Sequence, residues 1–331
     1  MSICVYYDSW AANWTDDPYA LDLANISKDV TIVNLAFANP KGTYKKGSFT
    51  FANTGLDFSV SFNTVKGAIQ ILRKRGVKVL LSVGGHTYPY NISAPYANYN
   101  DMKNLLDDLG CDGLDIDWEP SNGIEVDWKF GEIIQTWKDI GIGYLTAACT
   151  GTGVYKPTGN GDGYQGMCIK GIVAKGHLLD AINIMAYDAG PITSFDPLIS
   201  YTSYRTIYKG ALLLGFELGP QAWGGYITTL DDVKKACNWV QKDRLAGNQG
   251  GIFIWCFHKN PAGSPDLNMT ITTARSICPL PNPTPPSPPL IQTPPQNPPI
   301  TPIPCQSPQS DKKKKMDLIL YHLEVIISLL L

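Results

Sequence analysis

The stretch Asp-Gly-Leu-Asp-Ile-Asp-Trp-Glu at residues 112–119 alternates acidic and apolar side chains over its second half. Successive side chains of a β-strand point to opposite faces, so Asp115, Asp117 and Glu119 share one face. The apolar residues between them share the other face. Stacked carboxyl groups are costly to bury, and a fold is expected to tolerate them mainly where a site uses them. Such a strand suits a parallel barrel, whose helices cover its apolar face and whose active site lies where the strands end.

Short β-rich apolar runs occur eight times within residues 1–277. They are Ile3–Tyr7, Val30–Ala38, Val77–Val83, Gly113–Trp118, Ile142–Cys149, Ala181–Tyr187, Gly210–Phe216 and Gly251–Phe257. Helical patterns lie between several of them, at Phe62–Arg75, Asp127–Ile140 and Leu230–Leu245. Asn63 is expected to cap the first of these helices, and Asp231 the third. This alternation predicts an α/β fold, a closed (β/α)8 TIM barrel. An open doubly wound sheet is the alternative, but no G-x-G-x-x-G follows the first run.

Composition narrows the class of protein. The chain has 331 residues, of which 44% are hydrophobic and 17% charged, and this excludes full disorder. The net charge of −2 gives no basic surface for nucleic acid. The eight cysteines form no C-x-x-C pair, so zinc-ribbon and thioredoxin chemistry are not indicated. The first apolar run is too short for a secretory signal, which leaves the localisation open.

The C-terminal part differs in composition. Residues 278–310 are rich in proline and predict an extended linker, or else a ligand for a proline-reading domain. Residues 311–331 combine a lysine block with an apolar tail that is too short to span a bilayer. Weak contact with an anionic membrane surface is one interpretation of this tail. A poorly ordered tail or an oligomerising helix is the other, and a monomer is expected.

The acidic strand face has three interpretations: a metal site, a structural stack, or acid–base chemistry. A calcium loop needs a turn glycine after its acids, whereas the spacers here are apolar. Crowded carboxylates raise the pKa of one member, and Glu119 lies nearest the mouth. A protonated Glu119 can donate to a leaving oxygen, so acid–base chemistry is favoured, with no metal or other cofactor.

At this point the sequence resembles a known family. Residues 112–119 are similar to the D-G-x-D-x-D-x-E motif of glycoside hydrolase family 18, the chitinase family. Residues 81–85 resemble its S-x-G-G motif at the end of the third strand, and residues 185–188 its M-x-Y-D motif at the end of the sixth. The resemblance covers residues 1–277. It implies retaining hydrolysis of β-1,4-linked N-acetylglucosamine polymers, with the substrate's own acetamido oxygen as nucleophile.

The resemblance implies a role for each matching residue. Glu119 resembles the general acid, which later activates water. Asp117 resembles the carboxylate that holds the acetamido N–H and steadies the oxazolinium ion, and Asp115 the partner that shares a proton with it. Tyr187 resembles the hydroxyl that donates to the acetamido carbonyl.

Further residues are expected to line the substrate pocket. Trp255 would stack beneath the sugar, and Tyr6 and Ser82 would hydrogen-bond the buried aspartates, unless they are a core residue and a turn residue. The full expected set is Trp255, Asp188, Met185, Tyr6, Ser82, Gly85, Phe37 and Trp223. Trp10, Trp14, Tyr88 and Tyr90 are candidates for outer sugar stacking. Trp118 is expected to pack on a helix, and His86 to be a loop residue rather than a base.

Three finer expectations concern specificity. The segment between Phe216 and Gly251 has no room for an α+β insertion, which predicts an open cleft and endo-type cleavage of chitin or chito-oligosaccharides. An endo-β-N-acetylglucosaminidase acting on N-glycans is the nearest alternative. A chitin-binding lectin on an inactive barrel is the other, and the presence of Glu119 argues against it.

Overall fold

The computed structural model describes residues 1–91, 93–120, 127–154, 165–188, 196–220, 226–243, 245, 250–259 and 261–279. The expected linker over 278–310 lies outside these ranges except for its first two residues, and so does the whole expected tail over 311–331. The domain boundaries, the monomeric state and the membrane contact therefore stay predictions. No helix among the described residues has the length and apolar character needed to cross a membrane.

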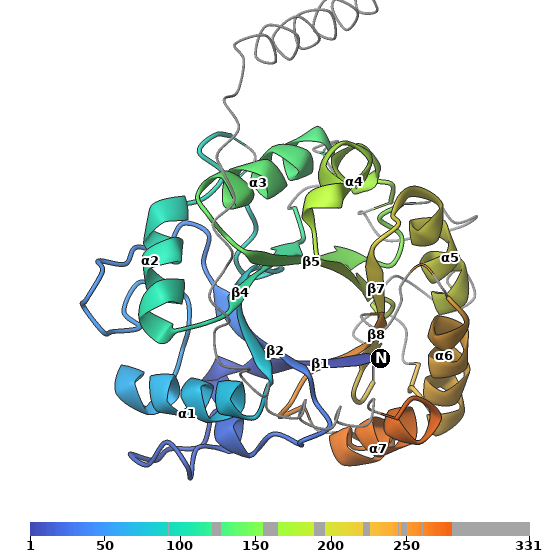
Figure 1. The fold of residues 1–331 in the computed structure, drawn as a ribbon, viewed down its shortest axis with the longest axis horizontal. Helices are drawn as coiled ribbons and strands as arrows, with labels where there is room; N and C mark the ends of the chain where they lie inside the picture. The colour runs from blue at the N-terminus through green and yellow to red at the C-terminus, as the bar shows by residue number, and fades with distance from the viewer. Residues whose placement is uncertain are drawn as a thin grey trace, which may run out of the picture. The chain divides into compact units, whose positions relative to one another are not determined.

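Within the described residues, eight parallel strands close into a barrel in chain order (Figure 1). The strands are β1 (Ser2–Asp8), β2 (Ile32–Ala38), β3 (Lys78–Gly84), β4 (Gly113–Trp118), β5 (Tyr144–Thr150), β6 (Ala181–Met185), β7 (Ala211–Glu217) and β8 (Gly251–Trp255). The predicted (β/α)8 barrel is confirmed. The open-sheet alternative is wrong, because β8 pairs with β1 and closes the sheet.

Helices surround the strands (Figure 1). They are α1 (Phe62–Lys74), α2 (Tyr99–Leu109), α3 (Asp127–Asp139), α4 (Ile169–Lys175), α5 (Pro197–Ile207), α6 (Leu230–Lys242) and α7 (Leu267–Ile277), with short 3-10 helices η1 (Ser9–Ala11), η2 (Asp22–Asn25) and η3 (Gly176–Leu178). The apolar spacing placed α1, α3 and α6 correctly to within a few residues, because it reports the buried face of each helix.

The predicted helix caps are wrong. Ser61, not Asn63, caps α1, and its side chain accepts a hydrogen bond from the backbone N–H of Thr64. Thr229, not Asp231, caps α6 in a reciprocal capping box. A cap needs extended backbone just before the first turn, and the hydrophobic period does not show which of several neighbouring polar residues has it.

The two faces of each strand pack into different layers. The outward side chains join those of the helices in one large core, and the inward side chains, such as Leu80, Leu213 and Phe253, fill the barrel. Trp118 faces outward and stacks on Phe130 of α3, with ring centroids 5.1 Å apart. Its expected packing on a helix is therefore confirmed.

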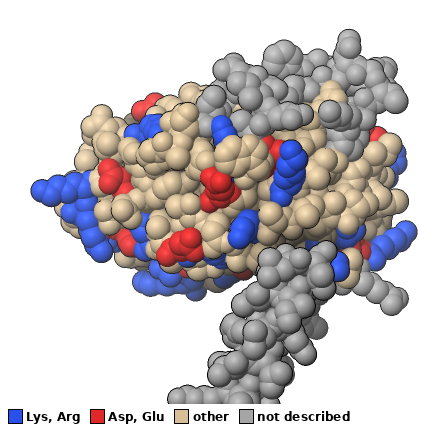
Figure 2. All heavy atoms as spheres, turned by 90° about the horizontal axis from the view of Figure 1, so that it is seen from above, with Lys and Arg blue, Asp and Glu red and all other residues tan. Residues whose placement is uncertain are grey.

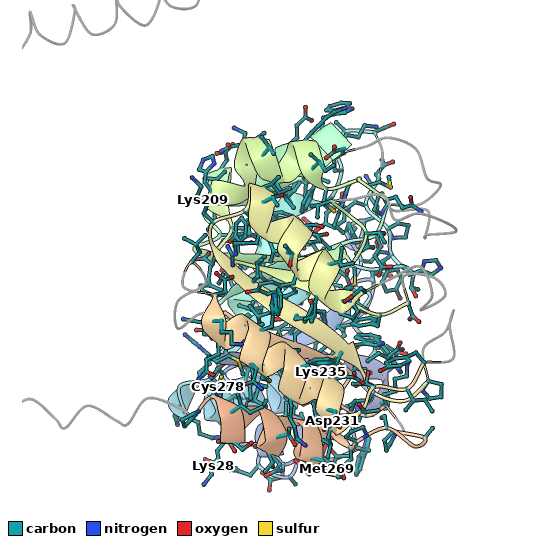
Figure 3. The ribbon with its side chains drawn as sticks, turned by 90° about the vertical axis from the view of Figure 1, so that its right-hand side faces the viewer. Lys28, Lys209, Asp231, Lys235, Met269 and Cys278 are labelled. Atoms are coloured by element: carbon teal, nitrogen blue, oxygen red, sulfur yellow. The ribbon has the colours of Figure 1, made fainter. Side chains whose placement is uncertain are left out.

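The labelled side chains mark the two ends of the barrel. In the side view of Figure 3, Lys28, Lys209 and Cys278 lie at the edge where strands begin. Asp231 and Met269, in the first turns of α6 and α7, lie towards the opposite edge, where the strands end.

Figure 2 shows acidic and basic side chains interspersed on one face, in line with the small net charge. The cysteines within the described ranges are free thiols.

Candidate functional site

The acidic face of β4 points into the barrel and towards its mouth. Asp115 is fully buried, Asp117 is 2% exposed, and Glu119 follows the strand in a half-buried position. We call these three residues the carboxylate ladder. In the strand register Ser82 lies opposite Asp115 on one side and Thr146 on the other, so neighbouring strands supply its polar surroundings.

Asp115 accepts hydrogen bonds on both carboxylate oxygens. Tyr6 and Ser82 donate to Oδ2, each at 2.8 Å. Thr146 donates to Oδ1 at 2.6 Å, and Asn183 donates to the same oxygen at 3.3 Å. Burial raises the pKa of Asp115, and these hydrogen bonds oppose the rise without cancelling it.

Sequence reasoning missed Thr146 and Asn183. Both residues are 1% exposed. The Thr146 hydroxyl and the Asn183 amide point into the barrel from strands that the sequence predicts. The signal that could have found them is a polar residue at an inward-facing position of a predicted strand. An inward polar residue beside a buried carboxylate is there to donate to it.

Asp117 has different surroundings. Its Oδ1 is buried and makes no hydrogen bond to any described residue. Burial, followed by the charges of Glu119 and Asp115, raises its pKa well above the ordinary value. The donors around Asp115 favour its ionised form, and the Oδ1 of Asp117 lacks such donors among the described residues.

The turn after β3 lies directly beside the ladder. Gly84 and Gly85 have φ angles of 118° and 88°, which favour glycine. A Cβ on Gly84 would lie 2.2 Å from the carbonyl oxygen of Asp117, and one on Gly85 would lie 3.3 Å from its Oδ2. The next backbone N–H, that of His86, donates to Oε1 of Glu119 at 3.1 Å. His86 thus serves the site through its backbone.

Tyr187 follows β6 and lies close enough to Asp117 and Glu119 for their charges to affect its hydroxyl. Burial comes first, and the charges of Asp117 and Glu119 add to it, in raising the pKa of the phenol well above 10. The hydroxyl is therefore a neutral donor at physiological pH. Met185 is 8% exposed inside the barrel, and Asp188 is half-buried beside Tyr187.

Three aromatic side chains form one side of the site. Phe37 and Trp255 stack with centroids 5.4 Å apart, and Trp10 lies 6.4 Å from Phe37 and 6.3 Å from Trp255. We call Trp10, Phe37 and Trp255 the aromatic wall. Trp10 is 52% exposed, so the wall reaches solvent. Such faces suit the apolar C–H side of a sugar ring.

Not every expected residue joins the site. Tyr90 is 2% exposed and packs against Trp118, so its expected role as an outer sugar-stacking residue is wrong. Strand parity gave no warning, because Tyr90 lies in a loop. Trp14 is 71% exposed, and Trp223 lies outside the described residues. Across the described ranges, no group of His, Cys, Asp and Glu is arranged to hold a metal ion.

Comparisons with known proteins identify the family and the fold. A profile of the glycosyl hydrolases family 18 matches residues 2–206. The chain is 27% identical to the chitinase Chi52 of Paenibacillus xylanexedens over 277 residues, which cover 70% of this chain and 51% of that protein. Matches to Chi52 and to two further curated chitinases cover between 32% and 61% of the length of those relatives.

Solved structures share the barrel. A family 18 chitinase from Pseudoalteromonas aurantia has a TM-score of 0.58 at 21% identity, covering 84% of this chain and all (100%) of that one. A fungal endo-β-N-acetylglucosaminidase has a TM-score of 0.58 at 16% identity, covering 82% and 97%. At these identities the likeness concerns the fold. Because the family profile covers more than half of the residues, the chain belongs to the glycosyl hydrolases family 18.

Proposed function

We propose that this protein is a retaining endo-hydrolase of β-1,4-linked N-acetylglucosamine polymers, such as chitin and chito-oligosaccharides. The observation that carries the proposal is the carboxylate ladder, which points into the barrel beside Tyr187 and ends with Glu119 at the mouth. Chitinases among its relatives support the choice of substrate.

In the first step Glu119 protonates the glycosidic oxygen while the substrate's acetamido oxygen attacks the anomeric carbon. The glycosidic bond breaks, and an oxazolinium ion forms. Asp117 accepts a hydrogen bond from the acetamido N–H, and the Tyr187 hydroxyl donates to the acetamido oxygen, which aims it at the carbon. In this proposal Asp117 starts protonated and passes its proton to the buried Asp115 carboxyl as that hydrogen bond forms, which leaves Asp117 ionised.

In the second step Glu119, now ionised, removes a proton from water. The water attacks the anomeric carbon on the face that the leaving group vacated, and the carbon–acetamido oxygen bond breaks. Two inversions give net retention. The backbone N–H of His86, 3.1 Å from Oε1 of Glu119, supports this role by stabilising the ionised carboxylate between the steps.

A Glu119→Gln variant tests this assignment. Turnover of chitin oligomers should fall by about 10²–10⁴-fold, the usual contribution of a general acid, whereas oligomer binding should persist. Glu132→Gln on the exposed face of α3 is the control; the new amide oxygen can still accept from the Tyr96 hydroxyl, so wild-type turnover should be kept. Unchanged turnover in Glu119→Gln would refute the assigned role.

An endo-β-N-acetylglucosaminidase acting on N-glycans remains the second candidate, and the structural likeness to a fungal enzyme of that name supports it. Separate incubation with chitin oligomers and with a high-mannose glycopeptide distinguishes the two. Binding of oligomers without any turnover by the wild type would identify the lectin alternative. Helix α6 takes up much of the connection from β7 to β8, which leaves little room there for an insertion that would deepen the cleft. An open cleft is therefore proposed, and internal cuts in long oligomers are expected.

A further inference from the structure

A histidine that follows β8 lies between two aspartates and takes no part in the proposed chemistry. His258 Nδ1 lies 2.8 Å from Oδ1 of Asp8, and its Nε2 lies 2.7 Å from Oδ2 of Asp22. Its backbone N–H also donates to Asp8, at 3.1 Å. We call Asp8, Asp22 and His258 the His258 clamp.

The contacts of the clamp fix its protonation state. A carboxylate oxygen accepts hydrogen bonds, so an imidazole that bonds carboxylates through both nitrogens needs a proton on each. His258 is therefore an imidazolium in this arrangement. Burial disfavours the charge, but the two aspartates outweigh it and raise the pKa of His258 to about 9.

The other described groups around the imidazole ring carry no second positive charge that would disfavour the imidazolium. The Tyr7 hydroxyl donates to Asp22 and its ring meets His258 edge-on, with centroids 5.0 Å apart. The Phe257 ring lies 4.7 Å away, and the Cys256 thiol is near Asp8. Lys259, the next cation along the chain, is paired with Glu217 instead.

The clamp joins two parts of the chain that carry the aromatic wall. Asp8 ends β1 and Asp22 begins η2, so Trp10 lies in the segment between them. His258 follows β8 three residues after Trp255. Asn13 ties the same segment internally, since its Oδ1 accepts from the backbone N–H of Asp22 at 2.8 Å. The clamp thus fastens the Trp10 segment to the strand end that holds Trp255.

We propose that His258 is a positioning residue, which as an imidazolium holds Trp10 against Trp255 and Phe37 and so sets the affinity for saccharide. Loss of one proton would leave a nitrogen lone pair facing a carboxylate, and this contact would turn from attractive to repulsive. The segment with Trp10 would then separate from β8. The saccharide part of this inference rests on the proposed function.

The first experiment measures the dissociation constant of chitotetraose at pH 6, 8 and 10. It uses a Glu119→Gln background, so that turnover does not interfere. Affinity should be similar at pH 6 and 8 and about tenfold weaker at pH 10. Adding His258→Gln should weaken affinity at pH 6 and remove the change between pH 8 and 10. His177→Gln on η3 is the matched control and should behave as the parent does.

The second experiment does not depend on saccharide or on the variant folding. The ring nitrogen shifts of His258 are followed by NMR in the full wild-type chain, with the ring assigned through contacts to Tyr7 and Phe257. A midpoint near 9 is expected, and a midpoint near 6.5 would overturn the inference. Asp22→Asn, which removes the negative charge that faces one ring nitrogen, should lower the midpoint.

The outcomes are separable. Binding that does not change with pH and is insensitive to His258→Gln would overturn the inference and leave the proposed function intact. Absence of both binding and hydrolysis at every pH would overturn the proposed function together with the saccharide part of this inference. The NMR midpoint would still decide whether the clamp is charged.

Discussion

Two carboxyls that lie two residues apart on β4 have different surroundings. Asp115 meets donors on both oxygens, whereas Asp117 has a buried oxygen without a partner among the described residues. A buried polar group without a partner costs free energy of unfolding and needs an explanation. A substrate amide that supplies the missing donor is the explanation that the proposed mechanism offers.

The hydroxyl of Thr146 should be worth more than an average hydrogen bond. Thr146→Val keeps the size of the side chain but deprives Oδ1 of Asp115 of its shortest contact. We expect a loss of about 1–3 kcal/mol in the free energy of unfolding, measured by urea denaturation. Thr270→Val in α7 is the control. Its hydroxyl bonds a helix carbonyl, so its loss should be smaller, and equal losses would contradict the argument.

Asp117 should make the fold less stable as the pH rises. Its pKa is raised on folding, so the folded state holds the proton more tightly and loses stability as the pH rises from about 3.8 through the raised value. In the Asp117→Asn variant this side chain is uncharged at every pH. Its Tm should exceed that of the wild type by about 4 °C at pH 7 and by much less at pH 4. Calorimetry at both pH values checks this, and equal differences would refute it.

At the scale of elements, the carboxyl ends of the strands and the turns after them do most to shape the site. The turn after β3 brings backbone against Asp117 and offers the N–H of His86 to Glu119. The segment after β1 brings Trp10 to the aromatic wall. These connections lie at the C-terminal ends of the strands, where the active sites of (β/α)8 barrels are generally found.

Gly84 should tolerate no side chain. Gly84→Ala adds a Cβ 2.2 Å from the carbonyl oxygen of Asp117, in addition to the strain of a positive φ. We expect a loss of about 3 kcal/mol or more in the free energy of unfolding. Gly141→Ala is the matched control, because its φ is 92° and no described atom lies within 4 Å of the added carbon. It should cost about 1 kcal/mol, the strain alone.

At the scale of the whole molecule, local pattern predicted the barrel but not its long-range contacts. Apolar runs and strand parity were enough to predict the strands and to turn the ladder inward. The bond from His258 to Asp8 joins residues 250 apart, and no local period reports such a contact. Tyr90 was misassigned for the same reason: a loop residue has no period that tells which way it points.

The ends of the described domain are tied together by Arg275. Its guanidinium donates to the carbonyl oxygens of Met1 at 2.8 Å and Asp29 at 3.1 Å. A chain ending at Pro279 should therefore keep the Tm of the full chain and its turnover of soluble oligomers. A chain ending at Ala274 loses these bonds and should lose about 2 kcal/mol or more. Calorimetry of both chains checks this, and a large drop for the longer one would contradict the expected linker.

The pairing of β1 with β8 also has a consequence for biosynthesis. Strand β1 leaves the ribosome before the other strands of the barrel and finds its second neighbour only when nearly the whole domain has been translated. Until then the nascent sheet is an open one, with a bare row of amides and carbonyls along β1. Intermolecular pairing along that edge is the misfolding route that the topology creates, and slow translation before β8 would lengthen the exposure.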